Sequence, residues 1–572
     1  MSPVETAAPR APASAQAGPR SRAEAGNASS PVPAGGRAWM ACGVLLLVFG
    51  IYALSSPGHI DIVDGQARFD VAFNWVLNGR PLVTDGWIPF TGVPGRGGLH
   101  YSYFGAPASA FGVPLVWIGL YSNTSEFLFT LVSPLFGAAM ASFLFLLYLE
   151  LGLDRRRALA WTMVSSFATY VWAISNSSFD NAQHAFFTVA AVYCALLSAR
   201  RRSAWYAAVG GLLAGVLFMY QEYFLLVIPA LAIATLDGQL FSAHGRLSEP
   251  QRVERWLANT ADFLRRAWRG PGEERSALLR YCTFLATVSV GFALSLLYNH
   301  MRFGTWLQYG KIHTVTTNKY LWGNPLAGFL TLLISPGKSV FLYSPTLVLG
   351  VLGMRRLARR RPELAASIVA TSALLIAFLS FIRFAGGDWC WGPRYLTPLL
   401  PLWALAFPFC VEGVGRRKLV SALVAASFFV QLLALSVETQ RFFFEHAFHD
   451  YFWAEDSWVY FKHSALFSRF HEAMTLPQGP PTTADKFNSV PQPDRTTYAP
   501  LGTPNGVPRS LAPVWMRQYK VFYLPRPWPF WVASLDPKLR PITLSAWLIG
   551  LLSVVGLGVC LIRRGMQAPE LR

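Results

Sequence analysis

The chain has few charged residues for its length. Only 14% of its 572 residues are Asp, Glu, Lys or Arg, whereas 53% are hydrophobic, and the mean hydropathy is +0.34. A soluble globular protein carries about 25% charged residues, so this composition argues against an ordinary soluble enzyme and predicts an integral membrane protein.

Cysteines and cofactor motifs are also scarce. The six cysteines include no CxxC pair, so neither a disulfide framework nor a zinc motif is predicted. The loops contain no Gly-rich phosphate loop, which argues against direct use of a nucleotide sugar. His446, His449 and Asp450 fit one helical face, but the phenylalanines around them favour an amphipathic surface helix over a metal site. We therefore expect no cofactor and assign no metal ligands.

About twelve hydrophobic runs are long enough to cross a membrane. Backbone groups in lipid must be hydrogen-bonded within their own segment, so a run of roughly 17 to 25 apolar residues predicts a helix. The fold class predicted is an all-α integral membrane bundle. The runs lie near residues 38–55, 125–150, 158–176, 183–199, 203–220, 223–237, 281–299, 339–354, 364–382, 395–412, 419–437 and 542–562.

Basic residues exceed acidic ones, 49 to 30, which gives a net charge of +19. This excess does not indicate a nucleic-acid partner, because the basic clusters all fall on one side when the runs are threaded alternately through a membrane. By the positive-inside rule, both termini are then cytoplasmic in a multi-pass inner-membrane protein. The clusters are Arg155 to Arg157, Arg200 to Arg202, the loop 238–280, Arg355 to Arg361, Arg416 to Lys418, and Arg563 with Arg564.

This threading divides the chain into four parts. Residues 1–37 are rich in Pro, Ala and Ser and are expected to be a disordered cytoplasmic tail. Residues 38–437 form the transmembrane module, and residues 438–541 an extracytoplasmic segment. Residues 542–572 supply the last span and a cytoplasmic tail.

The first outer loop, 56–124, is too long to be a simple connector. Its residues 67–77 show a helical pattern that ends at Asn78-Gly79, and we expect this helix to lie on the membrane surface. The apolar stretch from Phe111 to Tyr121 is short and contains Pro114, so we interpret it as interfacial. If it spanned the membrane, the later basic loops would change sides.

Ionisable and aromatic side chains gather at the outer ends of the predicted spans. Asp61 and Asp64 follow the first span, and a carboxylate pair at the mouth of a membrane bundle is a functional-site candidate. All of these side chains face one aqueous compartment in the threading above. The others are Asp180, His184, Glu222, Lys338, Asp388, Trp391, Arg394 and Tyr395.

Several of these residues have plain structural alternatives. Asp64 could instead cap the surface helix, and Asp180 could cap the fourth span. Glu222 could simply end a tight hairpin. Lys338 could extend to lipid headgroups, and Trp391 could belong to the interfacial aromatic belt. These alternatives stay open at this stage.

Acids and cations at one membrane face suit a reaction between a lipid-borne anion and a hydroxyl. For a sugar carried on a lipid phosphate, a carboxylate takes the proton of the acceptor hydroxyl as it attacks the anomeric carbon. Lys and Arg side chains hold the departing phosphate as its negative charge develops. Because phosphate is already a good leaving group, no separate general acid is needed.

Three motifs extend this interpretation. The acidic loop is followed by Tyr101-Ser102-Tyr103-Phe104-Gly105-Ala106-Pro107, and later by the stretches from Ser335 to Pro345 and from Gly386 to Leu396. In their order, over roughly residues 38–440, they resemble the GT-C superfamily of polyprenyl-phosphate-sugar-dependent glycosyltransferases. That superfamily includes protein O-mannosyltransferases and the lipid A aminoarabinose transferase.

The resemblance implies an inverting transfer on the outer face of the membrane, with Asp64, or less favourably Asp61, as the catalytic base. It implies that Lys338 and Arg394 contact the lipid phosphate, and it makes Tyr101 and Tyr103 candidate donor-binding residues. The implied partners are a polyprenyl-phosphate-linked sugar, a hydroxyl acceptor on a glycan, lipid or protein, and membrane lipid. Some members use a divalent cation and many do not, so the resemblance leaves metal dependence open.

Two other functions remain alternatives. A transporter or flippase of lipid-linked glycans would place charged residues near the middle of the spans, whereas these spans carry almost none. A glycan polymerase or ligase with a diphosphate-linked donor would share the cationic site but depend less on Asp64.

Overall fold

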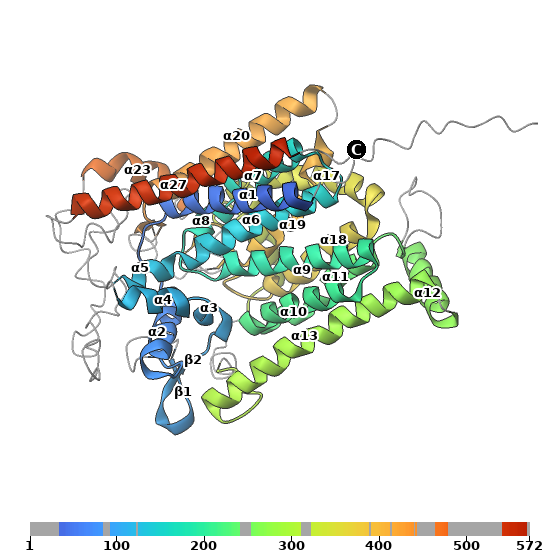
Figure 1. The fold of residues 1–572 in the computed structure, drawn as a ribbon, viewed down its shortest axis with the longest axis horizontal. Coiled ribbons are helices and arrows are strands. Elements are labelled where there is room, and N and C mark those ends of the chain that lie inside the picture. Colours follow the sequence, from blue (N-terminus) through green and yellow to red (C-terminus); the bar gives the residue numbers. More distant parts are fainter. Residues whose placement is uncertain are drawn as a thin grey trace, which may run out of the picture.

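The computed structural model describes residues 34–83, 92–121, 124–240, 253–270, 272–310, 322–387, 390–411, 414–439, 441–442, 464–478 and 540–568. These ranges are mostly helical, with one two-stranded antiparallel sheet that pairs Val93 with Tyr101 (Figure 1). Short 3₁₀ helices carry the label η. The predicted helical class is therefore confirmed for the described part of the chain.

The helices and strands follow one another in three stretches. The first contains α1 (Ala34–Leu54), α2 (Val63–Asn78), β1 (Gly92–Pro94), η2 (Arg96–Gly98), β2 (His100–Ser102), α3 (Ala106–Ala110), α4 (Val113–Leu120) and α5 (Ser125–Thr130). The second contains α6 (Val132–Glu150), α7 (Arg155–Phe167), α8 (Val171–Ser175), α9 (Asn181–Arg201), α10 (Ala204–Tyr220), η3 (Glu222–Leu226), α11 (Ile228–Ala232), η4 (Ile233–Leu236), α12 (Val253–Arg269) and α13 (Glu273–Phe303). The third contains α15 (Pro325–Leu333), α16 (Val340–Tyr343), α17 (Leu347–Arg360), α18 (Pro362–Ser380), η5 (Arg394–Leu399), α19 (Leu400–Ala404), η6 (Phe407–Cys410), α20 (Val414–Ser436), α23 (Ala465–Thr475), η8 (Leu476–Gln478) and α27 (Arg540–Gln567).

Seven helical segments in the described ranges are long and apolar enough to cross a membrane, judged by length and composition. This is fewer than the twelve unbroken runs of the sequence. The segments are Gly35–Leu54, Ser125–Glu150, Asn181–Arg201, Glu273–Phe303, Pro362–Ser380, Arg416–Ser436 and Leu544–Gln567.

Several other predicted spans are broken into short helices instead of being continuous. The prediction of unbroken helices was wrong for the runs near 158–176, 223–237, 339–354 and 395–412, which hold α7 with α8, η3 to η4, α16 with α17, and η5 to η6. Pro229, Pro345 and Pro398 lie in three of these runs and lack the N–H that a continuing helix requires. The run near 203–220 is the 17-residue helix α10.

The break between α7 and α8 shows how such an interruption is stabilised. The Ala168 carbonyl accepts hydrogen bonds from the Thr346 hydroxyl at 2.5 Å and the Ser427 hydroxyl at 2.6 Å. The Tyr170 N–H donates to the Ser344 hydroxyl at 2.8 Å. Backbone groups freed by the break are thus satisfied by side chains from distant segments, as burial away from water requires.

Helices α1 and α27 lie side by side and antiparallel (Figure 1). A Cβ atom added to Gly36 would lie 3.1 Å from Ala568, and one added to Gly50 would lie 2.6 Å from Val555. Because glycine has no side chain, these positions let the two helix backbones approach closely. Arg155 donates to the Ala568 carbonyl at 2.8 Å, so both described chain ends lie at one end of the bundle.

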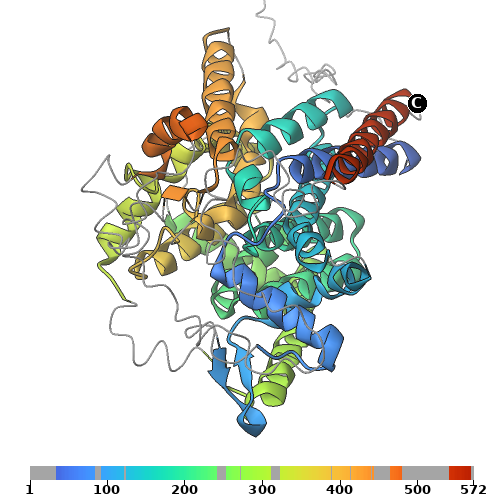
Figure 2. The ribbon, with the colours of Figure 1, turned by 90° about the vertical axis from the view of Figure 1, so that its left-hand side faces the viewer.

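The same end collects much of the basic character of the chain, and we call it the basic end. Glu150 there accepts hydrogen bonds from Arg37 at 2.7 Å and Arg200 at 2.5 Å, and Arg361 pairs with Asp237 at 2.9 Å. At the opposite end, which Figure 2 views, α1, α10 and α13 finish and α9 begins. We call it the hairpin end because it carries β1 and β2. Which end faces the cytoplasm stays a prediction.

The predicted first-loop helix is α2, which stops at Gly79, a residue in the left-handed conformation at φ 65°. Its Phe69 and Phe73 are buried with Val116 and Phe129 of α4 and α5, so this side of the helix is covered by protein. Helix α4 has eight residues, too few to cross the hydrocarbon layer, in keeping with the prediction that the stretch does not span it.

Candidate active site

The start of α2 is fastened to the loop that precedes α9. The Asp61 carboxylate, 2% exposed, accepts hydrogen bonds from the Ser177 hydroxyl at 2.7 Å and the Ser178 N–H at 2.8 Å. A Cβ atom added to Gly65 would lie 2.3 Å from the Ser178 side chain, so only glycine permits this approach. Asp64 is thereby set at a fixed place in the first turn of α2.

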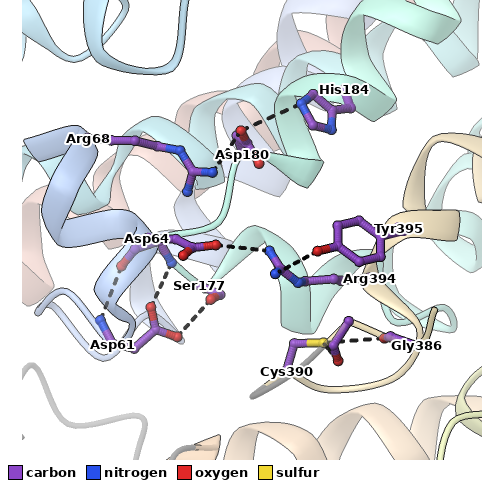
Figure 3. Close-up of polar contacts among 12 residues, drawn as sticks. Asp61, Asp64, Arg68, Ser177, Asp180, His184, Gly386, Cys390, Arg394 and Tyr395 are labelled. Carbon is purple, nitrogen blue, oxygen red and sulfur yellow. Dashed lines mark hydrogen bonds and ion pairs between the residues drawn. The ribbon is translucent and has the colours of Figure 1, made fainter. Parts of the chain in front are cut away.

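Asp64 faces Arg394 across the site (Figure 3). Arg394 Nη1 lies 3.4 Å from Asp64 Oδ2, and the two side chains are 10% and 17% exposed. The N-cap residue of α2 is Ile62, with no side-chain cap hydrogen bond, so Asp64 lies inside the helix and does not occupy the cap. Arg394 also donates to the Tyr395 hydroxyl at 3.1 Å and lies over the Phe179 ring at 3.9 Å.

A second ion pair lies beside the first. Arg68 is one helical turn after Asp64 on α2, and its Nη2 lies 3.0 Å from Asp180 Oδ2, just before α9. His184 Nε2 lies 3.7 Å from the same oxygen (Figure 3). The Arg68 guanidinium also covers the Phe104 ring at 4.2 Å. Two guanidinium groups and two carboxylates therefore meet at the hairpin end.

The charges of this cluster stabilise one another. Burial alone would raise the pKa of the Asp180 carboxyl, but Arg68, His184 and Arg394 lower it below its ordinary value. Burial acts to lower the pKa of Arg394, yet Tyr395 and Asp64 raise it above the usual range. Burial, and then the Asp64 charge, raise the pKa of Tyr103. At neutral pH, Asp180 and Arg394 are therefore charged and Tyr103 is a neutral phenol.

Lys338 contacts backbone carbonyls of the segment that precedes Arg394. Its ammonium donates to the carbonyls of Gly387 at 2.8 Å, Cys390 at 2.7 Å and Gly392 at 3.3 Å. An ammonium has three donors, and these carbonyls are enough to use all three. Lys338 thus fixes the loop that leads to Arg394, and its predicted contact with a lipid phosphate stays a prediction.

The remaining predicted residues have other surroundings. Tyr101 on β2 is buried edge-on against Phe303 at 6.2 Å, and Glu222 at the start of η3 interacts electrostatically with Arg302. Trp391 is 2% exposed and lies edge-on to Tyr343 at 5.0 Å. It lines a small cavity that also contacts Asp61, Ser177, Cys390 and Thr439. Asp388 lies outside the described residues.

Comparisons with known proteins add a distant structural likeness. No protein-family model matches the chain, and no curated protein matches it in sequence. Among solved structures, the crystal structure of ArnT from Cupriavidus metallidurans bound to undecaprenyl phosphate matches with a TM-score of 0.37 and 13% identity. The match covers 94% of this chain and 78% of that one.

Sequence reasoning missed Arg68, although its position four residues after Asp64 puts both on one face of the predicted helix. It also missed Tyr223, whose hydroxyl is buried without a hydrogen-bond partner among the described residues. Tyr223 interacts electrostatically with Tyr395, Asp180 and Arg394. No sequence spacing links it to them.

The part of the chain that the structure describes contains no cluster of candidate metal ligands. Within those residues, no group of three or more His, Cys, Asp or Glu side chains is placed to hold an ion. His446, His449 and Asp450 lie outside them. The chemistry that the cluster itself offers is a partly exposed carboxylate beside buried guanidinium groups.

Proposed function

We propose that this protein is a membrane glycosyltransferase that moves a sugar from a polyprenyl-phosphate donor to a hydroxyl acceptor. The observation that carries the proposal is the pair formed by Asp64 and Arg394. A carboxylate that can accept a proton and a guanidinium that can bind an anion lie 3.4 Å apart at one end of an apolar helical bundle. A transfer from a lipid phosphate needs one group of each kind.

The proposed reaction is a single displacement with inversion. Asp64 takes the proton of the acceptor hydroxyl, whose oxygen forms the new bond to the anomeric carbon. The bond from that carbon to the phosphate oxygen breaks, and the electron pair leaves with the lipid phosphate. Arg394 stabilises the charge that develops on this oxygen, since a guanidinium binds phosphate with paired N–H donors.

The contacts of Asp64 suit the role of base better than those of Asp61. The separation of 3.4 Å from Arg394 exceeds the 2.7–2.9 Å typical of a close charge-assisted bond, and the side chain is partly exposed. The Asp61 carboxylate is buried and accepts two hydrogen bonds from the neighbouring loop. We propose that Asp61 positions α2 and that Asp64 reacts.

We further propose that the hairpin end faces the extracytoplasmic side of the inner membrane. The basic end then faces the cytoplasm, in agreement with the positive-inside rule, and both termini are cytoplasmic. The donor is membrane-borne, and its phosphate meets the acceptor at the outer face.

The test is transfer by the purified full-length protein from a panel of radiolabelled polyprenyl-phosphate sugars to acceptors in a membrane extract. Asp64→Asn should lower the transfer rate by about 10²–10⁴-fold, the usual contribution of a general base, with donor binding retained. Asp262→Asn removes a partly exposed acid on α12 at the basic end and serves as the control with unchanged transfer. Equal transfer by Asp64→Asn would remove this residue from the mechanism. Movement of the lipid-linked sugar across vesicles without transfer would favour a flippase.

A further inference from the structure

Arg68 has more hydrogen-bond donors than its surroundings use. Its side chain is buried, and its Nη2 forms an ion pair with Asp180 Oδ2 at 3.0 Å. The Nε and Nη1 atoms are also buried, yet they make no hydrogen bond to any described residue. A guanidinium has five N–H donors, and buried donors are normally satisfied. Arg68 therefore has buried N–H donors that no acceptor of the described residues uses.

These donors lie in the same electrostatic environment as the Asp64–Arg394 pair. Tyr103 interacts electrostatically with Asp64, Arg68 and Arg394, so it lies within reach of both ion pairs. Arg394 also interacts with Asp180, the partner of Arg68. The Arg394 Nε is likewise buried without a hydrogen bond to a described residue. Unused N–H donors thus come from two arginines that share one cluster.

Among the described residues, the cluster holds two carboxylates and two guanidinium groups, and the atoms of Arg68 and Arg394 that lack a hydrogen bond are all N–H donors. A further carboxylate or hydroxyl oxygen would accept one or two of these bonds, whereas a phosphate offers several oxygens that bind guanidinium groups in pairs. The ligand that fits such a set of donors is a phosphate monoester.

We infer that Arg68 is a second cationic ligand of the donor's phosphate, acting with Arg394, and that Asp180 holds its guanidinium in position. This inference rests on the proposed function, because it assigns a residue to the phosphate of the same donor. Asp180 lowers the positive potential at the phosphate and at the same time orients Arg68. The two partners of this ion pair therefore act on anion binding in opposite directions.

The opposite effects of Arg68 and Asp180 on anion binding distinguish this role from that of a purely structural ion pair. If the pair only stabilised the fold, Arg68→Gln and Asp180→Asn would weaken lipid binding alike. If Arg68 binds phosphate, Arg68→Gln weakens binding, whereas Asp180→Asn leaves a free guanidinium and binding is equal or tighter. Arg68→Lys keeps the charge and should recover part of the affinity.

The experiment measures the affinity of the full-length protein in nanodiscs for a polyprenyl phosphate and for the polyprenol of the same length. Arg68→Gln should bind the phosphate about tenfold more weakly, the equivalent of one charge-assisted hydrogen bond, with unchanged binding of the polyprenol. Thermal unfolding of each variant checks its fold. If Arg68→Gln does not fold, the phosphate affinities of the single variants Arg68→Lys and Asp180→Asn test the role of Arg68 instead.

The outcomes distinguish the inference from the function on which it rests. Wild-type protein that binds both lipids equally would contradict the proposed function. Wild-type protein that prefers the phosphate and loses this preference in Arg394→Gln, but not in Arg68→Gln, would overturn the role of Arg68 alone. Equal weakening in Arg68→Gln and Asp180→Asn would overturn it as well.

Discussion

Arg394 owes its position to residues that do not themselves react. Gly387 has φ 71°, and a Cβ atom there would lie 2.5 Å from Arg394 Cγ, so both conformation and space require glycine. Lys338 binds the carbonyls of the same loop, including that of Gly387 itself. The Thr397 hydroxyl donates to the Arg394 carbonyl at 2.5 Å. Gly387, Lys338 and Thr397 thus hold one guanidinium in place.

Replacement of Lys338 tests this account at the residue scale. Lys338→Met leaves buried carbonyls without their donor and should lower the free energy of unfolding by about 3 kcal/mol. Binding of polyprenyl phosphate should weaken through the displaced Arg394. Chemical denaturation and lipid binding measure the two effects, with the exposed Lys418→Met as control. A variant that keeps full stability and loses phosphate binding would show that Lys338 contacts the phosphate directly, as the sequence motif suggested.

At the scale of elements, hydrophobic runs predicted where most helices lie but not whether each one is continuous. The runs near 38–55 and 183–199 correspond to α1 and α9. The run near 158–176 breaks because Thr346 and Ser427 supply hydrogen bonds to Ala168. These hydroxyls lie 178 and 259 residues away along the chain. No local pattern reports such partners, so sequence reasoning extends a helix through them.

Another pairing of distant elements joins the first outer loop to the chain after α20. His59 Nδ1 lies 3.0 Å from the Ile60 carbonyl, and its Nε2 lies 3.4 Å from Glu438 Oε2. Both ring nitrogens face oxygen acceptors, which favours the imidazolium. Arg469 of α23 donates to the Glu438 carbonyl at 3.0 Å. The segment after α20 is therefore tied to the loop that carries Asp61 and Asp64.

This pairing predicts a pH dependence of stability. Burial alone would lower the pKa of His59, but Glu438 raises it above the ordinary value. A raised folded-state pKa means that the stabilisation is fully present below about pH 6.5 and is lost as the pH rises through the elevated pKa. The free energy of unfolding of the wild type should exceed that of His59→Gln by on the order of 1 kcal/mol at pH 6, and by less at pH 9. The control for thermal unfolding at both pH values is His300→Gln, because His300 stacks on Trp306 and forms no ion pair with a carboxylate of the described residues. A difference that grows with pH would contradict the assignment.

At the scale of the whole molecule, the fold brings together residues that are far apart in sequence. Asp64 and Arg394 are 330 residues apart. Their meeting was expected from threading and from the motif resemblance, because both put them at outer ends of spans. Lys338 shows the limit of that reasoning, since its carbonyl partners depend on a loop conformation that spacing does not encode. The contacts of Arg68 depend likewise on how α2 meets the start of α9.

The central claim is that the hairpin end, and not the basic end, binds the phosphate of a membrane lipid. The most direct measurement uses a polyprenyl phosphate with a photoreactive group next to the phosphate, cross-linked to the full-length protein and mapped by mass spectrometry. The account predicts cross-links in the segments around 64–68, 101–104 and 394–395, reduced by Arg394→Gln and by competing polyprenyl phosphate. Cross-links confined to the arginine-rich segments 200–202 and 355–361 would contradict it.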